Sequence, residues 1–581
     1  MKDNCKVNTG MLIVCSAAAA FAFCVYAPYN IYFPNAEEFT FTFYDFWWMP
    51  LLCFAAVAAA LIGVGFVFPK FRGGWCGILF AVTLAMLLQG SVLYQDQGSF
   101  NGLPYDWRSN LSRIIQNAVI WLLLIGGCVF CTQKWKRKSA EVFSVGSALL
   151  LAFLLVTVGI LITSSKKEYL QRGETFVSDR DLLTVSQSAN VIVLVPDMFD
   201  SSYMESILAT DPDIAETFRD FTWYRNATAC FGATNYSLGS FLSGGLMLNQ
   251  QPSYRETLNA NYETDILFPT LLENGWSVGI YTEGKFIPRK LAAETCNCLN
   301  GQAVITDIPA FLSAIYRMAA CTCAPDALRP FVWLTGNEFD GLYTMKDAAA
   351  EPYTISNSRF YKLLGTRKME VTQQPCFRMI HLYGAHYPYI SDEALNPIPP
   401  SYSDENAVRA AKGVLKMTEL YLEHLKENGF YDNSLVIIMA DHGYSVDGGL
   451  TNPLLMIKPA GERKEFSVSD APASHEDLQK TILNALKLNA EGTKGENIFM
   501  LGNDRESERV YYQLFDTAAS GQSRLVEYTI SPEGNARKYY RLTDREILPD
   551  GESRQHSAYC SYCQQNGQEP LDIPNDMSVM H

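Results

Sequence analysis

Asp441 and His442 stand side by side at the end of the segment NSLVIIMADHG, and they are the residues of this chain with the clearest capacity for chemistry. The aliphatic run before them, from Leu435 to Met439, predicts a buried strand, and open α/β sheets place their chemistry at the carboxyl ends of such strands. An Asp oxygen and a His nitrogen are also a common ligand pair for zinc or manganese. Because one such pair is weak support for a site, partners are needed from elsewhere in the chain.

Other apolar runs also end in acids or histidines. The segment ANVIVLVPD ends in Asp197, and CFRMIHLYGAH contains His381 and ends in His386. His475, in SHEDLQKTIL, stands at the start of a predicted helix. The chain has only 7 histidines, so several of them at such points count for more than any one. Taken singly, His386 and His381 are best interpreted as packed imidazoles, with His381 facing the sheet.

The segment CFGATNYSLGSFLSGG (230–245) supplies a candidate nucleophile, Thr234. Small residues surround it, and the spacing that follows predicts a helix beginning near Ser237. The N–H groups at a helix amino terminus stabilise a phosphate or a developing oxyanion. A Thr hydroxyl attacks well only when a metal or a base lowers its pKa. The ordinary alternative is that Thr234 merely caps the helix.

The elements that position these residues alternate between strands and helices. WSVGIYTE (276–283) is a further apolar run, and residues 405–428 have apolar positions at helical spacing that lead into the strand before Asp441. This alternation predicts an α/β domain whose mostly parallel central sheet is wrapped on both faces. After residue 505, RVYYQLFD, RLVEYTISPEG and ARKYYRLTD predict a small C-terminal antiparallel sheet that closes one edge.

Five stretches before residue 164 are long and apolar enough to span a bilayer, which predicts a five-helix transmembrane bundle. The first could alternatively be a cleaved signal peptide, because SAAAAFA resembles an export sequence. Lys and Arg cluster in alternate loops, which predicts a cytoplasmic amino terminus and an extracytoplasmic position for everything after residue 164. The stretches are 10–28, 48–69, 76–94, 115–133 and 143–163.

The predicted organisation has four parts: a transmembrane domain (1–164), a juxtamembrane linker (165–188), a catalytic domain (189–545) and a polar tail (546–581). The chain has 46 Lys+Arg and 61 Asp+Glu, and the acidic excess lies after residue 164. Such an acidic domain argues against nucleic acid as a partner. Eight of the 15 cysteines lie in the same part, and an even number in an oxidising compartment predicts disulfides, with the doublets Cys296/Cys298 and Cys321/Cys323 as candidates. The remaining four are Cys230, Cys376, Cys560 and Cys563.

The order of these motifs resembles the alkaline phosphatase and sulfatase superfamily. An acid after the first strand, a hydroxyl at a helix start, a GxH segment, ADHG and SHxDL follow one another as they do there. Five spans before that domain resemble its membrane branch, the lipid A phosphoethanolamine transferases and the lipoteichoic acid synthases. GATNYSLGSFLS is similar to the former, and NGFYDNSLVIIMADHG is more similar to the latter.

The resemblance implies a role for each matching residue. The metal ligands would be Asp197, Thr234, Asp441 and His442, holding a divalent Zn²⁺ or Mn²⁺ ion. Thr234 would also be the nucleophile that carries the phosphoryl-linked group covalently, while His386 and His475 would bind the phosphate or protonate the leaving group. Lys285 and His381 are the candidate substrate-binding residues.

The sequence also departs from the family pattern. Position 197 is Asp where the membrane transferases have Glu, and Ser240 stands where phosphoethanolamine transferases have a Cys that pairs with one just ahead of the nucleophile. Cys230 therefore lacks that partner, and Cys376 is the alternative. Asp200 is either a second ligand or, more simply, the cap of the following helix.

The implied function is that of an integral protein of the bacterial plasma (inner) membrane. It would take phosphoethanolamine or phosphoglycerol from a membrane phospholipid donor and pass it to an envelope glycan or lipid acceptor. One alternative is a hydrolase of the phosphodiesterase or phosphatase type, in which water accepts the same intermediate. A true sulfatase needs a Cys or Ser within CxPxR, which the residues after Cys230 do not supply, and an inactive scaffold is a further alternative.

Overall fold

The chain forms two compact units in its computed structural model. The membrane unit comprises residues 1–174 and 300–347, and the α/β unit comprises residues 175–299 and 348–581. The C-terminal cysteines Cys560 and Cys563 lie outside the described residues. The structure describes residues 9–39, 41–93, 105, 107–108, 110–165, 170, 174–249, 253–334, 338–339, 341–346, 350–444, 452–502, 505, 508–517, 522–535, 539–547 and 553–555.

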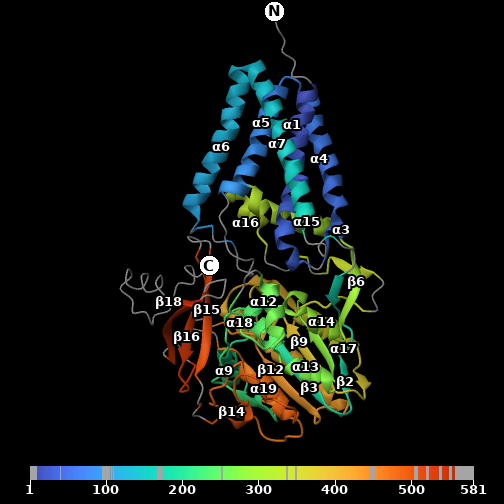
Figure 1. Cartoon of the computed structure of the whole chain (residues 1–581), viewed down its shortest axis with the longest axis vertical. Coiled ribbons are helices and arrows are strands. Elements are labelled where there is room, and N and C mark those ends of the chain that lie inside the picture. Colours follow the sequence, from blue (N-terminus) through green and yellow to red (C-terminus); the bar gives the residue numbers. More distant parts are fainter. Residues whose placement is uncertain are drawn as a thin grey trace, which may run out of the picture. The chain divides into compact units, whose positions relative to one another are not determined.

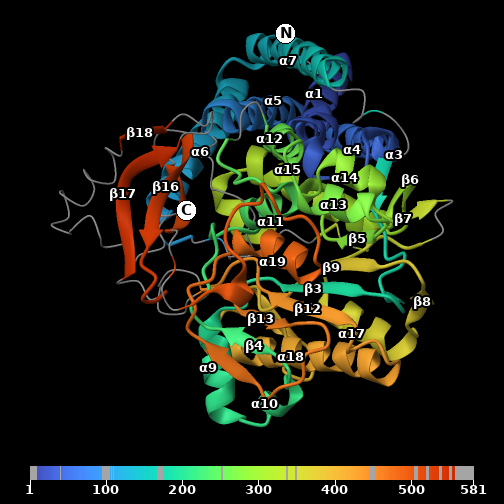
Figure 2. The same cartoon turned by 60° about the horizontal axis from the view of Figure 1, so that its bottom comes forward.

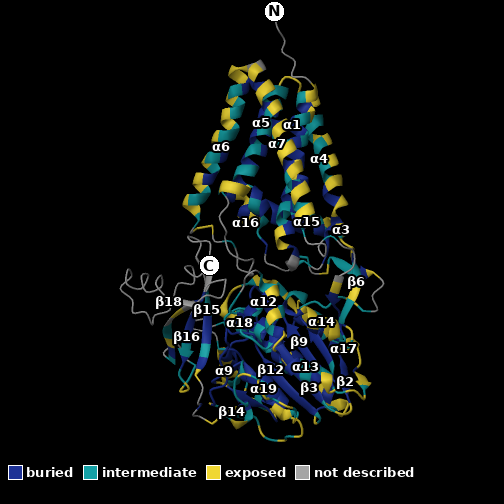
Figure 3. Cartoon of the chain, in the orientation of Figure 1, coloured by how far each residue is buried: buried dark blue, intermediate teal, exposed yellow. Residues whose placement is uncertain are grey.

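The membrane unit contains five helices long and apolar enough to cross a membrane, as the sequence predicts (Figure 1). The first begins as α1, which packs against α4, α5 and α7. That packing favours a retained span over a cleaved signal peptide. Few residues of the spans formed by α4, α6 and α7 are buried (Figure 3), as expected for helices that meet lipid. The elements are α1 (Thr9–Phe21), η1 (Ala22–Tyr26), α2 (Ala27–Tyr32), η2 (Phe33–Glu38), α3 (Phe43–Phe46), α4 (Trp48–Val67), α5 (Arg72–Leu88), η3 (Gln89–Leu93), α6 (Leu111–Lys134) and α7 (Lys136–Ser164).

Residues 300–347 add a second part to the membrane unit, although they lie far along the chain from the spanning helices. Strand β6 (Cys298–Ile305) pairs antiparallel with β7 (Tyr343–Lys346). Between these strands lie α15 (Ile308–Cys323), η5 (Asp326–Leu328) and α16 (Arg329–Val332).

The α/β unit is built on a seven-stranded sheet in the order β14-β4-β13-β12-β3-β9-β5. Strands β12, β3, β9 and β5 run parallel, and only β13 runs against its neighbours. The mostly parallel sheet predicted from the sequence is thereby confirmed. Its strands are β3 (Asn190–Pro196), β4 (Thr222–Tyr224), β5 (Ser277–Tyr281), β9 (Cys376–Leu382), β12 (Ser434–Met439), β13 (Leu455–Lys458) and β14 (Ser467–Ser469).

Helices cover both faces of this sheet (Figure 2). Helices α11, α13 and α19 lie on one side, and α17 and α18 lie on the other. Every residue of β3, β9 and β12 is buried, which explains why these strands are continuous apolar runs. The helices that matter below are α9 (Ser201–Thr210), α11 (Thr234–Ser243), α13 (Leu267–Glu273), α17 (Asn357–Thr366), α18 (Asp404–Glu427) and α19 (Asp477–Ala485).

The predicted C-terminal strands form an antiparallel sheet, β15-β16-β17-β18. The expectation that they close an edge of the central sheet is wrong, because β14 and β5 are that sheet's edge strands. Residues 174–186, expected to belong to a linker, contain the short strands β1 (Glu174–Val177) and β2 (Thr184–Ser186). The four C-terminal strands are β15 (Arg509–Thr517), β16 (Gln522–Ile530), β17 (Tyr540–Ile547) and β18 (Ser553–Gln555).

The disulfides predicted among the described cysteines are wrong, because all of these cysteines are free thiols. The doublet Cys296/Cys298 belongs to the α/β unit, whereas Cys321/Cys323 lies on α15 of the membrane unit. The alternative partner for Cys230 also fails, because its thiol lies 3.7 Å from the Ser474 hydroxyl instead.

Candidate metal and nucleophile site

Three neighbouring strands bring the predicted acids together at one edge of the central sheet. Asp197 follows β3, His381 lies near the end of β9, and Asp441 follows β12. Since β3 pairs in parallel with both β9 and β12, their carboxyl ends meet. One ligand atom each from Asp197, His381 and Asp441 lies within 4.8 Å of the other two, and all three residues are buried.

The polar atoms at this point have the pattern expected of cation ligands. Asp197 Oδ1, His381 Nε2 and Asp441 Oδ2 are buried without a hydrogen-bond partner among the described residues. Leaving such atoms unpaired costs free energy unless a cation or a ligand engages them. Two carboxylates and imidazole nitrogens suit Zn²⁺ or Mn²⁺, so the residues present fit a divalent cation.

His442 joins this group and links it to the candidate nucleophile. Its Nε2 lies 3.8 Å from Asp197 Oδ1, 3.6 Å from Asp441 Oδ2 and 3.4 Å from the Thr234 hydroxyl. Its Nδ1 lies 2.9 Å from the Gly443 carbonyl, which is a hydrogen-bond acceptor and so fixes the proton on Nδ1. The Nε2 lone pair is therefore turned toward the acids and toward Thr234, as a metal ligand requires.

His381 has the same arrangement, which the sequence did not reveal. Its Nδ1 lies 2.9 Å from the Thr282 hydroxyl, and its Nε2 lies 3.5 Å from Asp197 Oδ2. The side chain is therefore directed at the metal candidates, as well as being buried within the fold. The signal that could have found it is its register: His381 pairs with Val195 on β3, two residues before Asp197.

The pKa values of Asp197, Asp441 and His442 are shifted because two carboxylates lie close together among histidines. Burial opposes ionisation of Asp197, but the charges of His386, His381 and His442 outweigh it and hold the pKa of that carboxyl at about 2. Burial and the neighbouring Asp197 charge raise the pKa of Asp441. Although burial alone would lower it, the charges of Asp441 and Asp197 raise the pKa of His442. The close negative charges that raise the pKa of Asp441 and of His442 also attract a divalent cation.

Thr234 is the first residue of α11, so its hydroxyl lies at a helix amino terminus as predicted, three residues earlier than the expected start near Ser237. The cap position is Ala233, which has no side chain able to cap the helix. Thr234 is therefore not the cap, and its hydroxyl is available beside N–H groups that an α-helix leaves without internal partners.

The loop before Thr234 is held by the C-terminal sheet. Tyr512 of β15 donates its backbone N–H to the Cys230 carbonyl (2.8 Å), and its ring stacks on Phe231 at 5.4 Å. A Cβ on Gly232 would lie 2.4 Å from the Tyr511 hydroxyl, so a larger residue there would displace the Tyr511 side chain. The C-terminal sheet thereby positions the candidate nucleophile, Thr234.

Two backbone features constrain the candidate ligands Asp197 and Asp441. Gly384 has a φ of +65°, and a Cβ there would lie 2.2 Å from the Asp197 carbonyl oxygen. Met198 has a φ of 54°, a conformation that side chains disfavour, and donates its N–H to Asp441 Oδ1 at 3.1 Å. Such strain concentrates at functional sites.

The other predicted residues lie around this centre. His386 is partly exposed, its Nδ1 contacts the Tyr387 carbonyl, and its charge acts on Asp197. Lys285 pairs with Glu283 at 2.8 Å. Asp200 accepts the Ser202 N–H as the cap of α9, which agrees with the simpler of its two predicted roles.

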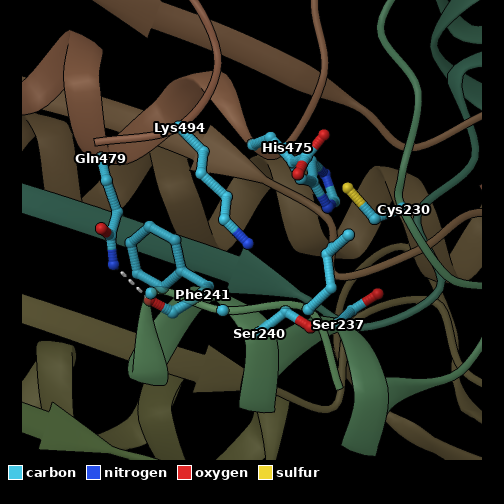
Figure 4. A pocket seen from close by; sticks show the side chains of 11 residues that line it. Cys230, Ser237, Ser240, Phe241, His475, Gln479 and Lys494 are labelled. Carbon is cyan, nitrogen blue, oxygen red and sulfur yellow. Dashed lines mark hydrogen bonds between the residues drawn. The ribbon is translucent and has the colours of Figure 1, made fainter. Parts of the chain in front are cut away.

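His475 lies two residues before α19 and lines a cavity of about 40 Å³ beside α11 (Figure 4). Burial and the nearby His442 charge lower the pKa of His475 to about 3, so this imidazole is neutral at ordinary pH. Its Nε2 has no hydrogen-bond partner among the described residues. Cys230, Ser237 and Ser240 line the same cavity.

A mostly parallel α/β sheet, buried Asp and His side chains at its carboxyl edge and a hydroxyl at a helix start together define an enzyme of the alkaline phosphatase superfamily. The family model named Sulfatase matches residues 190–488, more than half of the chain, and the chain belongs to the sulfatase family. The superfamily expected from the sequence is therefore confirmed. No curated protein sequence matches the chain significantly.

Several solved structures are similar to part of this chain. A 4S sulfatase of glycosaminoglycan metabolism in Bacteroides thetaiotaomicron is 15% identical, with a TM-score of 0.37 over 63% of this chain and 90% of that one. A phosphonate monoester hydrolase from Silicibacter pomeroyi is 13% identical, with a TM-score of 0.34 over 65% and 94%. The lipoteichoic acid synthase LtaP from Listeria monocytogenes is 12% identical, with a TM-score of 0.33 over 68% and 93%. Likenesses this distant say nothing about the substrate of this chain.

Proposed function

We propose that this protein moves a phospholipid-derived head group, phosphoethanolamine or phosphoglycerol, onto an envelope glycan or lipid through a covalent intermediate on Thr234. The observation that carries the proposal is the position of the Thr234 hydroxyl at a helix amino terminus, 3.4 Å from His442 Nε2 and beside two buried carboxylates. A divalent cation, Zn²⁺ or Mn²⁺, held by Asp197, Asp441, His442 and Thr234, with His381 beside it, would lower the pKa of the hydroxyl and neutralise charge at phosphorus.

The proposed transfer consists of two displacement reactions at phosphorus. In the first, Thr234 Oγ loses its proton and forms a bond to phosphorus, the bond from phosphorus to the diacylglycerol oxygen breaks, and that oxygen takes up a proton. In the second, an acceptor hydroxyl loses its proton and forms a bond to phosphorus, and Thr234 leaves as its hydroxyl. His386, which is partly exposed, and the neutral His475 are proposed to bind the phosphate or move these protons, and Lys285 and His381 to contact the substrate.

The membrane unit supports a lipid substrate, because its five apolar helices confine the protein to the surface where phospholipids are found. We place the α/β unit on the extracytoplasmic side of a bacterial plasma membrane, because Lys and Arg cluster at the opposite ends of the spans. The donor would then be a phospholipid of the outer leaflet.

Hydrolysis of the same intermediate by water is the second candidate function, because the geometry at Thr234 serves either acceptor. Sulfate-ester hydrolysis by a modified cysteine is disfavoured. Cys230 is buried and is followed by Phe231, and both burial and the nearby Glu476 charge raise the pKa of its thiol.

The test uses the full-length protein in vesicles that contain phosphatidylethanolamine or phosphatidylglycerol. Mass spectrometry of the Thr234 peptide is expected to find an adduct whose mass identifies the head group, and Thr234→Ala is expected to lack it. Thr234→Ser keeps a hydroxyl and is the matched control, expected to retain an adduct. Incorporation of ¹⁸O from labelled water into the released head-group phosphate would favour the hydrolase over the transferase.

A further inference from the structure

Residues 300–347 lie within the part of the chain that the sulfatase model matches, yet they pack with the spanning helices. The chain leaves the α/β unit after Leu299, joins the membrane unit, and returns at Ala348. This insertion, residues 300–347, contributes no residue to the candidate metal and nucleophile site and is not one of the five predicted spans.

Helix α15 is the apolar centre of the insertion and packs against α2 and η1. Its Tyr316 hydroxyl donates to the Cys24 carbonyl at 3.0 Å, and its ring stacks on Phe23 at 5.5 Å. Phe311 meets Phe41 edge-on at 4.9 Å. Pro28, four residues after Cys24, has no N–H, so the Cys24 carbonyl lacks its α-helical donor and is available to an outside donor. The buried face of α15 consists of Phe311, Ala314, Ile315, Met318, Ala319, Ala320, Cys321 and Cys323.

A buried polar network fixes the next turn of the insertion to the same bundle. Gln89, in the π-helical segment η3, donates to Asp326 Oδ1 at 3.1 Å and accepts from Asn117 Nδ2 at 2.7 Å. Asn117 in turn accepts the Asp326 N–H at 3.0 Å. Arg113 and Arg329 pair with Asp326 at 3.4 and 3.1 Å. Buried charges are tolerated only with such partners, so the network specifies one docked position for the insertion.

The insertion also exposes large apolar side chains. Phe331 is 80% exposed and Leu328 is 47% exposed. These values resemble those of lipid-facing residues on the spanning helices, such as Leu122 and Leu149, at 69% and 67%. Aromatic residues flank this surface, with the Trp333 ring 5.3 Å from Tyr105. Trp and Tyr concentrate where a membrane meets water, and Phe and Leu lie just below.

We propose that residues 300–347 are a second membrane anchor, with α15 held in the helix bundle and with Leu328 and Phe331 in the hydrocarbon of the adjoining leaflet. The occupant of the apolar surface is phospholipid, because η5, which carries Leu328, packs against the spanning helix α6. The α/β unit is then tied to the membrane by the insertion as well as by α7. This inference does not depend on the proposed head-group transfer.

Photo-crosslinking tests the lipid contact at two positions of equal exposure. The photoreactive residue p-benzoylphenylalanine replaces Phe331 in one variant and Met500, which is 81% exposed in the α/β unit, in the other. Both proteins are reconstituted in phosphatidylglycerol and phosphatidylethanolamine vesicles and irradiated. Phospholipid adducts are expected at position 331 and not at position 500. Equal adduct yields at the two positions, or none at position 331, would overturn the proposal.

Cleavage of the chain tests the anchor. A specific protease site is placed between Ser165 and Glu174, and cut protein in vesicles is washed with high salt and floated on a density gradient. The fragment that begins after the cut is expected to float with the vesicles, because the insertion still holds it. Its recovery in the aqueous fractions would contradict the proposal, whatever the enzymatic activity of the protein.

Discussion

Replacing Asp441 by Asn should have two effects of opposite sign on stability: it relieves charge repulsion in the metal-free protein, and it removes a ligand in the metal-bound protein. In the metal-free protein, the carboxylates of Asp197 and Asp441 have oxygens at most 4.8 Å apart. Two unit charges at that distance repel by about 3.5 kcal/mol at an effective dielectric constant near 20. His381 and His442 offset part of this repulsion, so Asp441→Asn is expected to stabilise the metal-free α/β unit by roughly 1–2 kcal/mol, or roughly 1–3 °C in melting temperature.

Adding the cation should reverse the order. A ligand at one hundred times its dissociation constant stabilises the folded protein by about 2.7 kcal/mol. The wild type is expected to gain that amount with Zn²⁺ or Mn²⁺, whereas Asp441→Asn, which has lost one of its two anionic ligands, should gain little. Differential scanning fluorimetry of the solubilised full-length protein, with and without each metal, measures both effects.

Asp200→Asn is the matched control, because Asp200 is also a buried carboxylate near the same sheet edge but caps α9. It is expected to lower stability and to keep the full metal-dependent shift. A metal-free Asp441→Asn protein less stable than the wild type, or one that retained the metal-dependent shift of the wild type, would refute the assignment of Asp441 as a cation ligand.

Three further changes test other parts of the account. His381→Gln is expected to weaken binding of the cation by about 10- to 100-fold, measured by calorimetry, because it removes a nitrogen turned toward the acids; unchanged affinity would make His381 purely structural. Gly443→Ala would place a Cβ 2.4 Å from Asp200 Oδ2, and the resulting shift of His442 should cost about 100-fold in adduct formation, while circular dichroism remains that of the wild type. Burial lowers the pKa of Lys458 to about 8, so between pH 8 and about pH 10.4 the unfolded state binds more protons than the folded state, and the free energy of unfolding should rise with pH. Lys458→Met should flatten this dependence of the melting temperature on pH. An unchanged dependence in Lys458→Met would exclude Lys458 as its source.

The central strands and their terminal residues could be predicted from the sequence because their signals are local. A strand buried on both faces must be apolar throughout, so Asp197 and Asp441 mark where β3 and β12 end. Thr234 was predictable as well, since small residues before a helical pattern indicate a helix start.

The features that the sequence did not reveal depend on contacts between distant segments. Whether His381 points toward the acids is decided by the register of β9 on β3. The place of α15 in the membrane unit depends on its packing against α2 and η1, because its 16 residues are shorter than a spanning helix. The spacing of the doublets Cys296/Cys298 and Cys321/Cys323 suggested a cross-link between them. That spacing does not indicate that the two doublets belong to different units.

The central claim is that Thr234 carries the head group. The most direct measurement is the mass of the Thr234 peptide after the full-length protein has been incubated with labelled phospholipid vesicles. A head-group phosphate on Thr234 that is present in the wild type and in Thr234→Ser, and absent from Thr234→Ala, is the predicted result. An unmodified wild-type peptide, or the same adduct in Thr234→Ala, would contradict the claim.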